Sequence, residues 1–384
     1  MKAYDAIVVG GGPAGSTAAS RLHQAGARVL VVDQCTFPRD KPCAGWITPQ
    51  TAAALQLDLD DYSRDHTLQP IRGFRCGTIG GREIEVRYDQ VISYGIRRRE
   101  FDAYLLQRCQ ADQQLGQSVT SISRTGSIWT INDEWTAPVL VGAGGTHCPV
   151  ARLLGARPRH RTTCVVAQEC EFQFEPLLDG GAELDVPLLY FCQDLAGYGW
   201  CFRKGSYWNI GLGRTDPAGL PRHVVEFTEF LRSRGVTVPM ESASWKGHSY
   251  ALYDSQLPVL LDDGVVLVGD AAGLAYGQSG EGIRPAVESA LMAAETIIAA
   301  AGHYDRNQLI PYQSRVVARF GTPQRSSWLS AIPSSWRQSL GLRLITNSWF
   351  ARHVILDQWF LHRDQPAYRT RVNERSASNV ACAG

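Results

Sequence analysis

The sequence lacks several features that would place it in other classes of protein. Its ten cysteines form no C-x-x-C pair, which argues against a zinc site. No apolar run approaches the roughly twenty residues that a membrane span needs, and no secretory leader precedes the first expected strand. The net charge of +1 gives no general attraction to nucleic acid. We therefore expect a cytoplasmic protein without a nucleic-acid partner, peripheral to a membrane at most.

A strand–turn–helix–strand pattern opens the chain. The apolar run at residues 4–9 predicts a buried parallel strand, and a glycine-rich turn at 10–15 follows it at once. An alanine-rich helix at 16–24 and a second apolar strand at 29–33 complete a unit of about thirty residues, the size of a βαβ motif. This pattern predicts dinucleotide binding; the alternative is a glycine-rich turn without a ligand.

The glycines of this turn have separate roles in the dinucleotide pattern. Gly10 allows the tight turn, Gly12 lets a pyrophosphate approach the backbone, and Gly15 lets the helix and strand pack closely. The helix N-terminus then presents free N–H groups and a partial positive charge to the phosphates. Asp33 ends the second strand, where a carboxylate takes a ribose hydroxyl.

Three distant segments, 10–33, 98–102 and 269–282, together resemble the flavoprotein superfamily that includes aromatic hydroxylases, flavin halogenases and geranylgeranyl reductases. The Gly-Asp-Ala-Ala sequence at 269–272 is similar to that superfamily's second flavin fingerprint. An aspartate at this place, Asp270, can hold the ribityl hydroxyls of FAD. The following loop and helix start can present N–H groups to the flavin's pyrimidine edge, where negative charge grows on reduction.

Three local matches point within this superfamily to the geranylgeranyl reductase group. The sequence Pro-Cys-Ala-Gly at 42–45 is similar to its Pro-Cys-Gly-Gly loop, with Ala44 in place of a glycine. The sequence Tyr-Gly-Trp-Cys-Phe at 198–202 resembles its substrate-cavity motif, although Arg203 replaces a proline. The sequence Ser-Gly-Glu-Gly-Ile at 279–283 resembles its loop beside the flavin ring.

The resemblance implies an α/β fold with a Rossmann-like FAD-binding domain and its parallel sheet, an inserted, mostly antiparallel substrate domain and a helical C-terminal end. We expect the FAD-binding domain at 1–75, 94–162 and 256–320, and the substrate domain at 76–93 and 163–255. The strands at 73–93 are expected to be exposed. Residues 321–384 are expected to form C-terminal helices and a tail, of which 365–384 is mobile.

Besides the glycines and Asp33, further residues are expected to bind FAD: Pro13, Ala14, Gln34, Lys41, Cys43, Ala44, Gly45, Arg98, Gly269, Asp270, Gly280, Gly282 and Ile283. Arg98 is expected at the phosphates or the adenine side, or else as a surface charge. Glu281 is expected to be a carboxylate favoured by the helix dipole rather than a catalytic acid.

The chemistry implied is hydride transfer from reduced FAD to a carbon–carbon double bond of a prenyl or similarly apolar substrate. Cys43 is the candidate proton donor, unless it only packs against the flavin. Tyr198, Trp200 and Phe202 are expected to line an apolar slot for the substrate, unless they form ordinary sheet core. The electron donor is open between NAD(P)H and a ferredoxin. Two alternatives are a flavin monooxygenase and a non-catalytic electron-transfer flavoprotein; the segment Gly144-Gly145, where the superfamily has Asp-Gly, leans against the monooxygenase.

The C-terminal end has an unusual composition. Beyond residue 302 the chain has eleven arginines and no lysine, together with four tryptophans. Arginine and tryptophan on short helices suit a membrane interface, and this would fit a substrate with a lipid tail. The alternative is a helical end that packs over the FAD-binding domain with its arginines in solvent.

Overall fold

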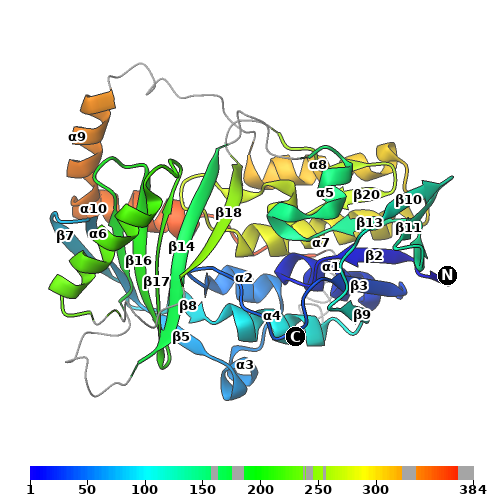
Figure 1. Ribbon diagram of the computed structural model, residues 1–384, viewed down its shortest axis with the longest axis horizontal. Helices are drawn as coiled ribbons and strands as arrows, with labels where there is room; N and C mark the ends of the chain where they lie inside the picture. Colours follow the sequence, from blue (N-terminus) through cyan, green and yellow to red (C-terminus); the bar gives the residue numbers. More distant parts are fainter. Residues whose placement is uncertain are drawn as a thin grey trace, which may run out of the picture.

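The computed structural model describes residues 1–156, 163–174, 186–236, 238, 245–253, 257–321 and 334–370. It confirms the expected α/β class with a parallel sheet, a large and mostly antiparallel sheet and C-terminal helices. The two large sheets lie toward opposite ends of the long axis (Figure 1). Within the described ranges, no helix has the length and apolar character needed to cross a bilayer.

The first large sheet has six strands, and all but β19 run parallel. Its order is β19 (Leu261–Asp262), β20 (Val265–Leu267), β13 (Leu140–Gly142), β2 (Ala6–Val9), β3 (Val29–Asp33) and β9 (Asp112–Leu115). The central strands are apolar throughout because both faces are buried, in one core with several helices and with Trp129, Ile131 and Trp135. These helices are α1 (Pro13–Gln24), α4 (Arg98–Arg108), α7 (Ile283–Ala300) and α8 (Arg306–Phe320).

The second large sheet has eight strands, paired antiparallel except at β18–β21 and β15–β6. Its order is β21 (Ala275–Tyr276), β18 (Lys246–Tyr253), β14 (Cys164–Gln173), β17 (Tyr207–Arg214), β16 (Gly197–Lys204), β15 (Leu188–Phe191), β6 (Gly73–Thr78) and β7 (Glu83–Arg87). One face packs on α6 (Leu220–Ser233), and the other packs on the π-helix η4 (Ala351–Phe360).

The prediction that the strands at 73–93 are exposed is wrong for β6. Phe74 and Cys76 are fully buried, because β6 pairs with β15 on one side and with β7 on the other. β7 forms the edge of the sheet and is the more exposed of the two strands. Sequence alternation indicated strands here but could not show which of them would be an interior strand.

Smaller elements complete the described chain. Two small sheets contain β4 (Trp46–Ile47), β8 (Ser93–Ile96) and β5 (Leu68–Ile71), and β1 (Lys2–Ala3), β12 (Trp135–Ala137), β11 (Ile128–Ile131) and β10 (Ile122–Thr125). The remaining described helices are α2 (Pro49–Ala54), α3 (Leu59–Asp65), η1 (Gly145–His147), α5 (Pro149–Leu153), η2 (Gly269–Ala272), α9 (Ser334–Ile345) and α10 (Ser348–Phe350).

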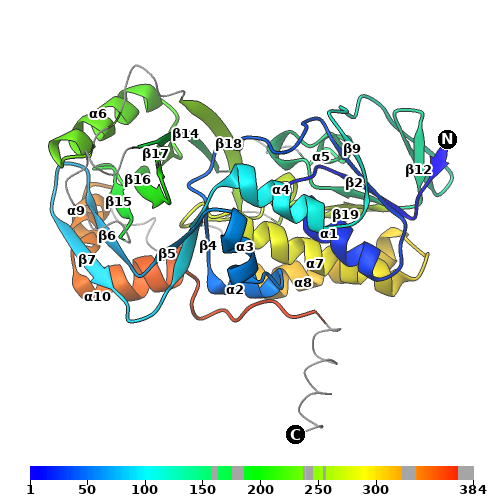
Figure 2. The same ribbon diagram turned by 90° about the horizontal axis from the view of Figure 1, so that it is seen from below.

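The segment that follows η4 is held against the first sheet's helices. Figure 2 shows it leaving the second sheet and passing below α2. The Arg284 guanidinium donates to the Gln365 carbonyl at 2.9 Å, and the Tyr368 hydroxyl donates to a Glu295 carboxylate oxygen at 2.8 Å. The prediction of a mobile tail is therefore wrong for residues 365–370. Residues 371–384 lie outside the described part of the chain.

Candidate functional site

A cavity of about 350 Å³ lies where the parallel strands end and the second sheet begins. β2, β3 and β13 are followed directly by residues that line it, as expected for the carboxyl edge of an open α/β sheet. Most of the residues predicted from the sequence line this cavity: Gly10, Gly12, Pro13, Ala14, Asp33, Gln34, Lys41, Cys43, Ala44, Gly45, Arg98, Tyr198, Trp200, Asp270, Gly280, Gly282 and Ile283.

Three predicted site residues do not line the cavity. A Cβ on Gly15 would lie 1.7 Å from the Gly10 carbonyl oxygen, so Gly15 lets α1 pack on the turn. Gly269 also packs closely, since a Cβ on it would press against the side chains of Ala14 and Ala286. Phe202 is fully buried, with its ring centroid 4.9 Å from that of Trp46. These residues shape the surroundings of the cavity without facing it.

The glycine-rich turn is built to receive an anion. Gly12 caps α1 without any side-chain hydrogen bond, and the first turn of this helix has no acidic residue. Arg39 adds a cation beside the turn: one terminal guanidinium nitrogen is 3.2 Å from Asp102, and the other is buried with no partner among the described residues. Asp33 accepts hydrogen bonds from the backbone N–H groups of Gly11 at 2.6 Å and Cys35 at 2.8 Å. A helix N-terminus beside an arginine that keeps one nitrogen available fits a diphosphate.

Arg39 was missed by the sequence analysis. The available signal was its place in the loop that leaves the carboxyl end of β3, since ligands bind at this edge.

Arg98 lies beside Cys43. Its guanidinium makes two hydrogen bonds to the fully buried Asp102 carboxylate, at 2.7 and 2.8 Å, and Arg98 and Cys43 both line the cavity, close enough for Cys43 to raise the pKa of Arg98. Burial by itself lowers the pKa of Arg98, but Asp102 and Cys43 outweigh burial and raise it. The guanidinium is therefore a fixed positive charge next to a thiol, and the alternative of a surface charge does not apply.

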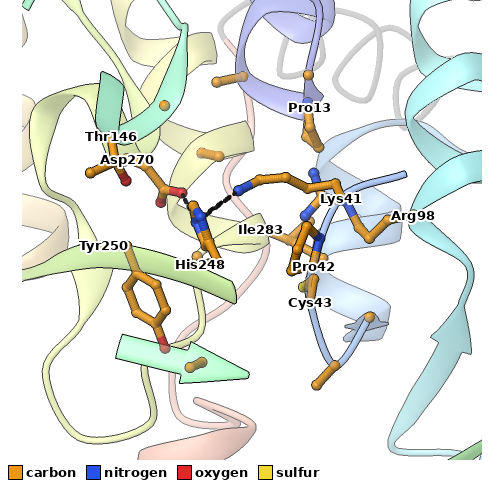
Figure 3. A pocket seen from close by; sticks show the side chains of 18 of the residues that line it. Pro13, Lys41, Pro42, Cys43, Arg98, Thr146, His248, Tyr250, Asp270 and Ile283 are labelled. Carbon is orange, nitrogen blue, oxygen red and sulfur yellow. Dashed lines mark hydrogen bonds and ion pairs between the residues drawn. The ribbon is translucent and has the colours of Figure 1, made fainter. Parts of the chain in front are cut away.

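Lys41 and His248 extend the charged wall of the cavity toward Asp270. Figure 3 shows Lys41 reaching from its loop toward His248 and Asp270. The Lys41 Nζ lies 2.7 Å from His248 Nε2, which in turn is 3.9 Å from an Asp270 carboxylate oxygen. Burial opposes ionisation of Asp270, but the His248 hydrogen bond and the Lys41 charge outweigh burial and lower its pKa.

His248 was also missed by the sequence analysis. It lies on β18 and reaches the cavity only because β18 pairs with β14. No local pattern around residue 248 signals this position.

The loop at 279–282 closes the cavity near the second sheet. The Tyr198 hydroxyl donates to the Ser279 carbonyl at 2.5 Å, which ties β16 to this loop. One Glu281 carboxylate oxygen accepts from the Arg284 backbone N–H at 2.7 Å, as a helix-start carboxylate does. The other oxygen is buried without a partner in the described residues, and burial raises the pKa of Glu281 to about 7.

The fold and this cavity define an FAD-dependent oxidoreductase. The donor set fits FAD because it combines an anion site at the turn with an ionised aspartate further along. Residues 3–65 match the family model described as an FAD binding domain.

Comparison with known proteins identifies the family. The chain is 32% identical over 323 residues to menaquinone reductase of Mycobacterium tuberculosis, covering 76% of each protein. It is 25% identical over 316 residues to digeranylgeranylglycerophospholipid reductase of Methanocaldococcus jannaschii, again covering 76% of each. The crystal structure of a geranylgeranyl bacteriochlorophyll reductase-like protein from Thermoplasma acidophilum matches with a TM-score of 0.76 at 20% identity, over 95% of this chain and 98% of that one. The chain belongs to the geranylgeranyl reductase-like family of FAD-dependent oxidoreductases.

Proposed function

We propose that this protein reduces a carbon–carbon double bond of a prenyl or similarly apolar substrate. The observation that carries the proposal is the position of Cys43 in the cavity, with Arg98 against its side chain and Tyr198 and Trp200 on the same wall. Bound FAD in its reduced form would supply the hydride. The site residues and the division into FAD-binding and substrate domains given above are part of this proposal.

Cys43 is assigned the second half of the reaction. After hydride addition to one carbon, its S–H bond breaks and the proton goes to the other carbon, which leaves a thiolate. The positive charge of the nearby Arg98 guanidinium stabilises that thiolate, and Asp102 holds the guanidinium in place. The substrate gains one hydride and one proton, and a proton from solvent restores the thiol.

Tyr198 and Trp200 are assigned to substrate binding. Both side chains lie on the same face of β16, because their positions differ by two, and their ring centroids are 6.1 Å apart. The indole N–H of Trp200 is satisfied by Asn209 at 2.7 Å, so its ring adds apolar surface without an unpaired donor. The ring of Phe360 on η4 packs on the ring of Tyr198, with 5.3 Å between the ring centroids, so η4 lies beside the same aromatic wall.

The C-terminal helices are assigned to peripheral membrane contact. Leu340 on α9 and Trp349 on α10 are 56% and 64% exposed, and Arg343 and Arg352 are exposed near them. Exposed apolar side chains between arginines suit an anionic bilayer surface, where a lipid-tailed substrate would be collected. The electron donor is assigned to NAD(P)H or a ferredoxin.

The test is an anaerobic single turnover. Photoreduced holoprotein is mixed with a menaquinone or a geranylgeranyl lipid, and flavin reoxidation is followed together with the mass of the product. The expected result is flavin reoxidation with a product 2 Da heavier, and with a menaquinone this gain of mass should remain after air has returned the quinol ring to the quinone. Stable reduced flavin with every alkene, together with oxygen-dependent product formation, would instead establish the monooxygenase. Reoxidation by one-electron acceptors alone, with no change in any alkene, would establish an electron-transfer protein.

A further inference from the structure

A buried polar group lies directly against the main chain of Cys43. Asn209 on β17 is 1% exposed, and its amide nitrogen lies 3.3 Å from the Cys43 carbonyl oxygen. The same nitrogen lies 3.1 Å from a carboxylate oxygen of Glu169 on β14. The amide oxygen accepts from the Trp200 indole at 2.7 Å, which fixes the orientation of the Asn209 side chain. Both donors of the amide are thereby directed toward the Cys43 loop and Glu169.

Glu169 holds the side chain that holds Cys43. It is 7% exposed and lines the cavity, and its carboxylate accepts from the same Asn209 amide that donates to the Cys43 carbonyl. The Cys43 peptide is thus tied to two side chains from paired strands of the second sheet, to Asn209 directly and to Glu169 through Asn209. A loop that pairs with no strand at this point has its backbone groups satisfied by side chains instead.

The neighbouring part of the loop is packed just as closely. Gly45 has φ +66°, and a Cβ on it would lie 2.6 Å from Lys204 Nζ. Lys204 is fully buried and bonded to Glu171 at 2.9 Å. The loop therefore rests on a buried, charge-compensated layer of the sheet, and displacing it would leave these groups unpaired.

We infer that Glu169 and Asn209 are positioning residues that hold the Cys43 peptide, so that its sulfur faces the reacting carbon in the cavity. This inference rests on the proton-donor role proposed for Cys43. Neither residue transfers a proton in this assignment. A donor displaced by about 1 Å loses on the order of 10²-fold in rate, so a rigid hold on this peptide contributes directly to turnover.

The experiment compares four variants as FAD-loaded holoprotein. Asn209→Leu and Glu169→Leu remove the hydrogen bonds, and Glu169→Gln keeps an oxygen that accepts from the Asn209 amide. Glu226→Gln is the matched control, because Glu226 is an exposed carboxylate on α6 of the same sheet domain. For each protein, the alkylation rate of Cys43 by iodoacetamide is measured by peptide mass, and single-turnover alkene reduction is measured over a range of substrate concentration.

The leucine variants are expected to change the Cys43 alkylation rate by about fivefold or more, and to lower the reduction rate at saturating substrate by about 10²-fold with KM nearly unchanged. Glu169→Gln is expected to keep most of the wild-type alkylation rate and most of the wild-type reduction rate, because it keeps an acceptor oxygen. If the leucine variants only disrupted the fold in general, this oxygen would make no difference. Wild-type alkylation in both leucine variants would overturn the inference. If a leucine variant does not retain FAD, Asn209→Ser and Glu169→Gln are compared with the wild type instead. An unchanged alkylation rate of Cys43 in Asn209→Ser would then overturn the inference.

Failure of the proposed function gives a different pattern. If the wild type reduces no alkene, or if Cys43→Ala reduces it as fast as the wild type, the proton-donor role is wrong. The alkylation measurement still decides whether Glu169 and Asn209 hold the Cys43 peptide, because it depends on neither hydride transfer nor substrate.

Discussion

The ammonium nitrogen of Lys41 lies 2.7 Å from Nε2 of His248, although 207 positions separate them in the chain. The contact joins the loop after β3 to β18 of the second sheet, across the cavity assigned to FAD (Figure 3). Burial lowers the pKa of Lys41 to about 8, and the charge of Asp270 opposes this effect only in part. Lys41 is therefore a cation at neutral pH that loses its proton more readily than an exposed lysine does.

We predict that Lys41 can be distinguished by amine labelling, since the chain has only four lysines. In FAD-free protein, the pH dependence of Lys41 acylation should give a pKa of about 8, and added FAD should protect it. Lys246, which pairs with Asp40 at the surface, is the internal control. Peptide mass spectrometry gives both rates. An acylation pKa of Lys41 near the usual lysine value of about 10.4, or labelling indifferent to FAD, would contradict the assignment.

Cys43→Ala should separate flavin binding from alkene reduction. We expect normal FAD content but product formation about 10² to 10⁴-fold slower, because the proton donor is lost. Flavin absorbance measures the first quantity and product mass the second. Cys164→Ala is the control, since Cys164 lies on β14 and does not line the cavity. Equal product formation in Cys43→Ala and wild type would assign Cys43 to packing against the flavin.

Glu281 should impose a pH dependence on stability. Its pKa rises from 4.5 to about 7 on burial, so between these values the folded state binds more protons than the unfolded state. The free energy of unfolding therefore falls as pH rises from about 4.5 to 7, by at most about 1.4 kcal/mol per pH unit for this group. Glu281→Gln should remove this contribution. Urea unfolding of FAD-free protein at pH 5 and pH 7.5 measures it, and parallel curves for both proteins would refute it.

Gly15→Ala should disrupt the nucleotide-binding unit. The added methyl would lie 1.7 Å from the Gly10 carbonyl oxygen, and the backbone of the turn or α1 would have to move. We expect a loss of about 3 kcal/mol or more in stability and much weaker FAD binding. Gly247→Ala is the matched control, because its new methyl would have only the Ala167 carbonyl oxygen nearby, at 3.9 Å. Denaturant unfolding with flavin fluorescence titration compares the two.

Arg284 should hold the segment at 362–366 in place. It is fully buried, bonds Glu288 at 2.9 Å, and donates to the carbonyls of His362, Gln365 and Pro366. Arg284→Met should cost about 3–5 kcal/mol, because a buried carboxylate and these carbonyls lose a partner. Hydrogen exchange near residue 365 should rise. Arg222→Met, on the exposed face of α6, should leave both measurements unchanged.

The nucleotide-binding turn was predictable because its signal is local. A buried parallel strand has a continuous apolar run, and a turn in which Gly15 touches Gly10 leaves no room for a side chain. The same holds for Asp270, which follows a short buried strand and precedes a glycine loop. In such segments, the residues that shape the backbone and the residues that would contact the ligand are close together in the sequence, so a short motif contains both.

The rest depended on pairing between distant strands. His248 and Glu169 reach the cavity through β18 and β14, and Asn209 reaches the Cys43 loop through β17. Period-two alternation shows that a strand has two faces, but not which face meets a loop some 130 to 200 residues away in the chain. The amino-acid sequence by itself determined a flavin-binding βαβ unit and its family; only the tertiary structure decided which charged and polar side chains surround Cys43, because long-range strand register brings them there.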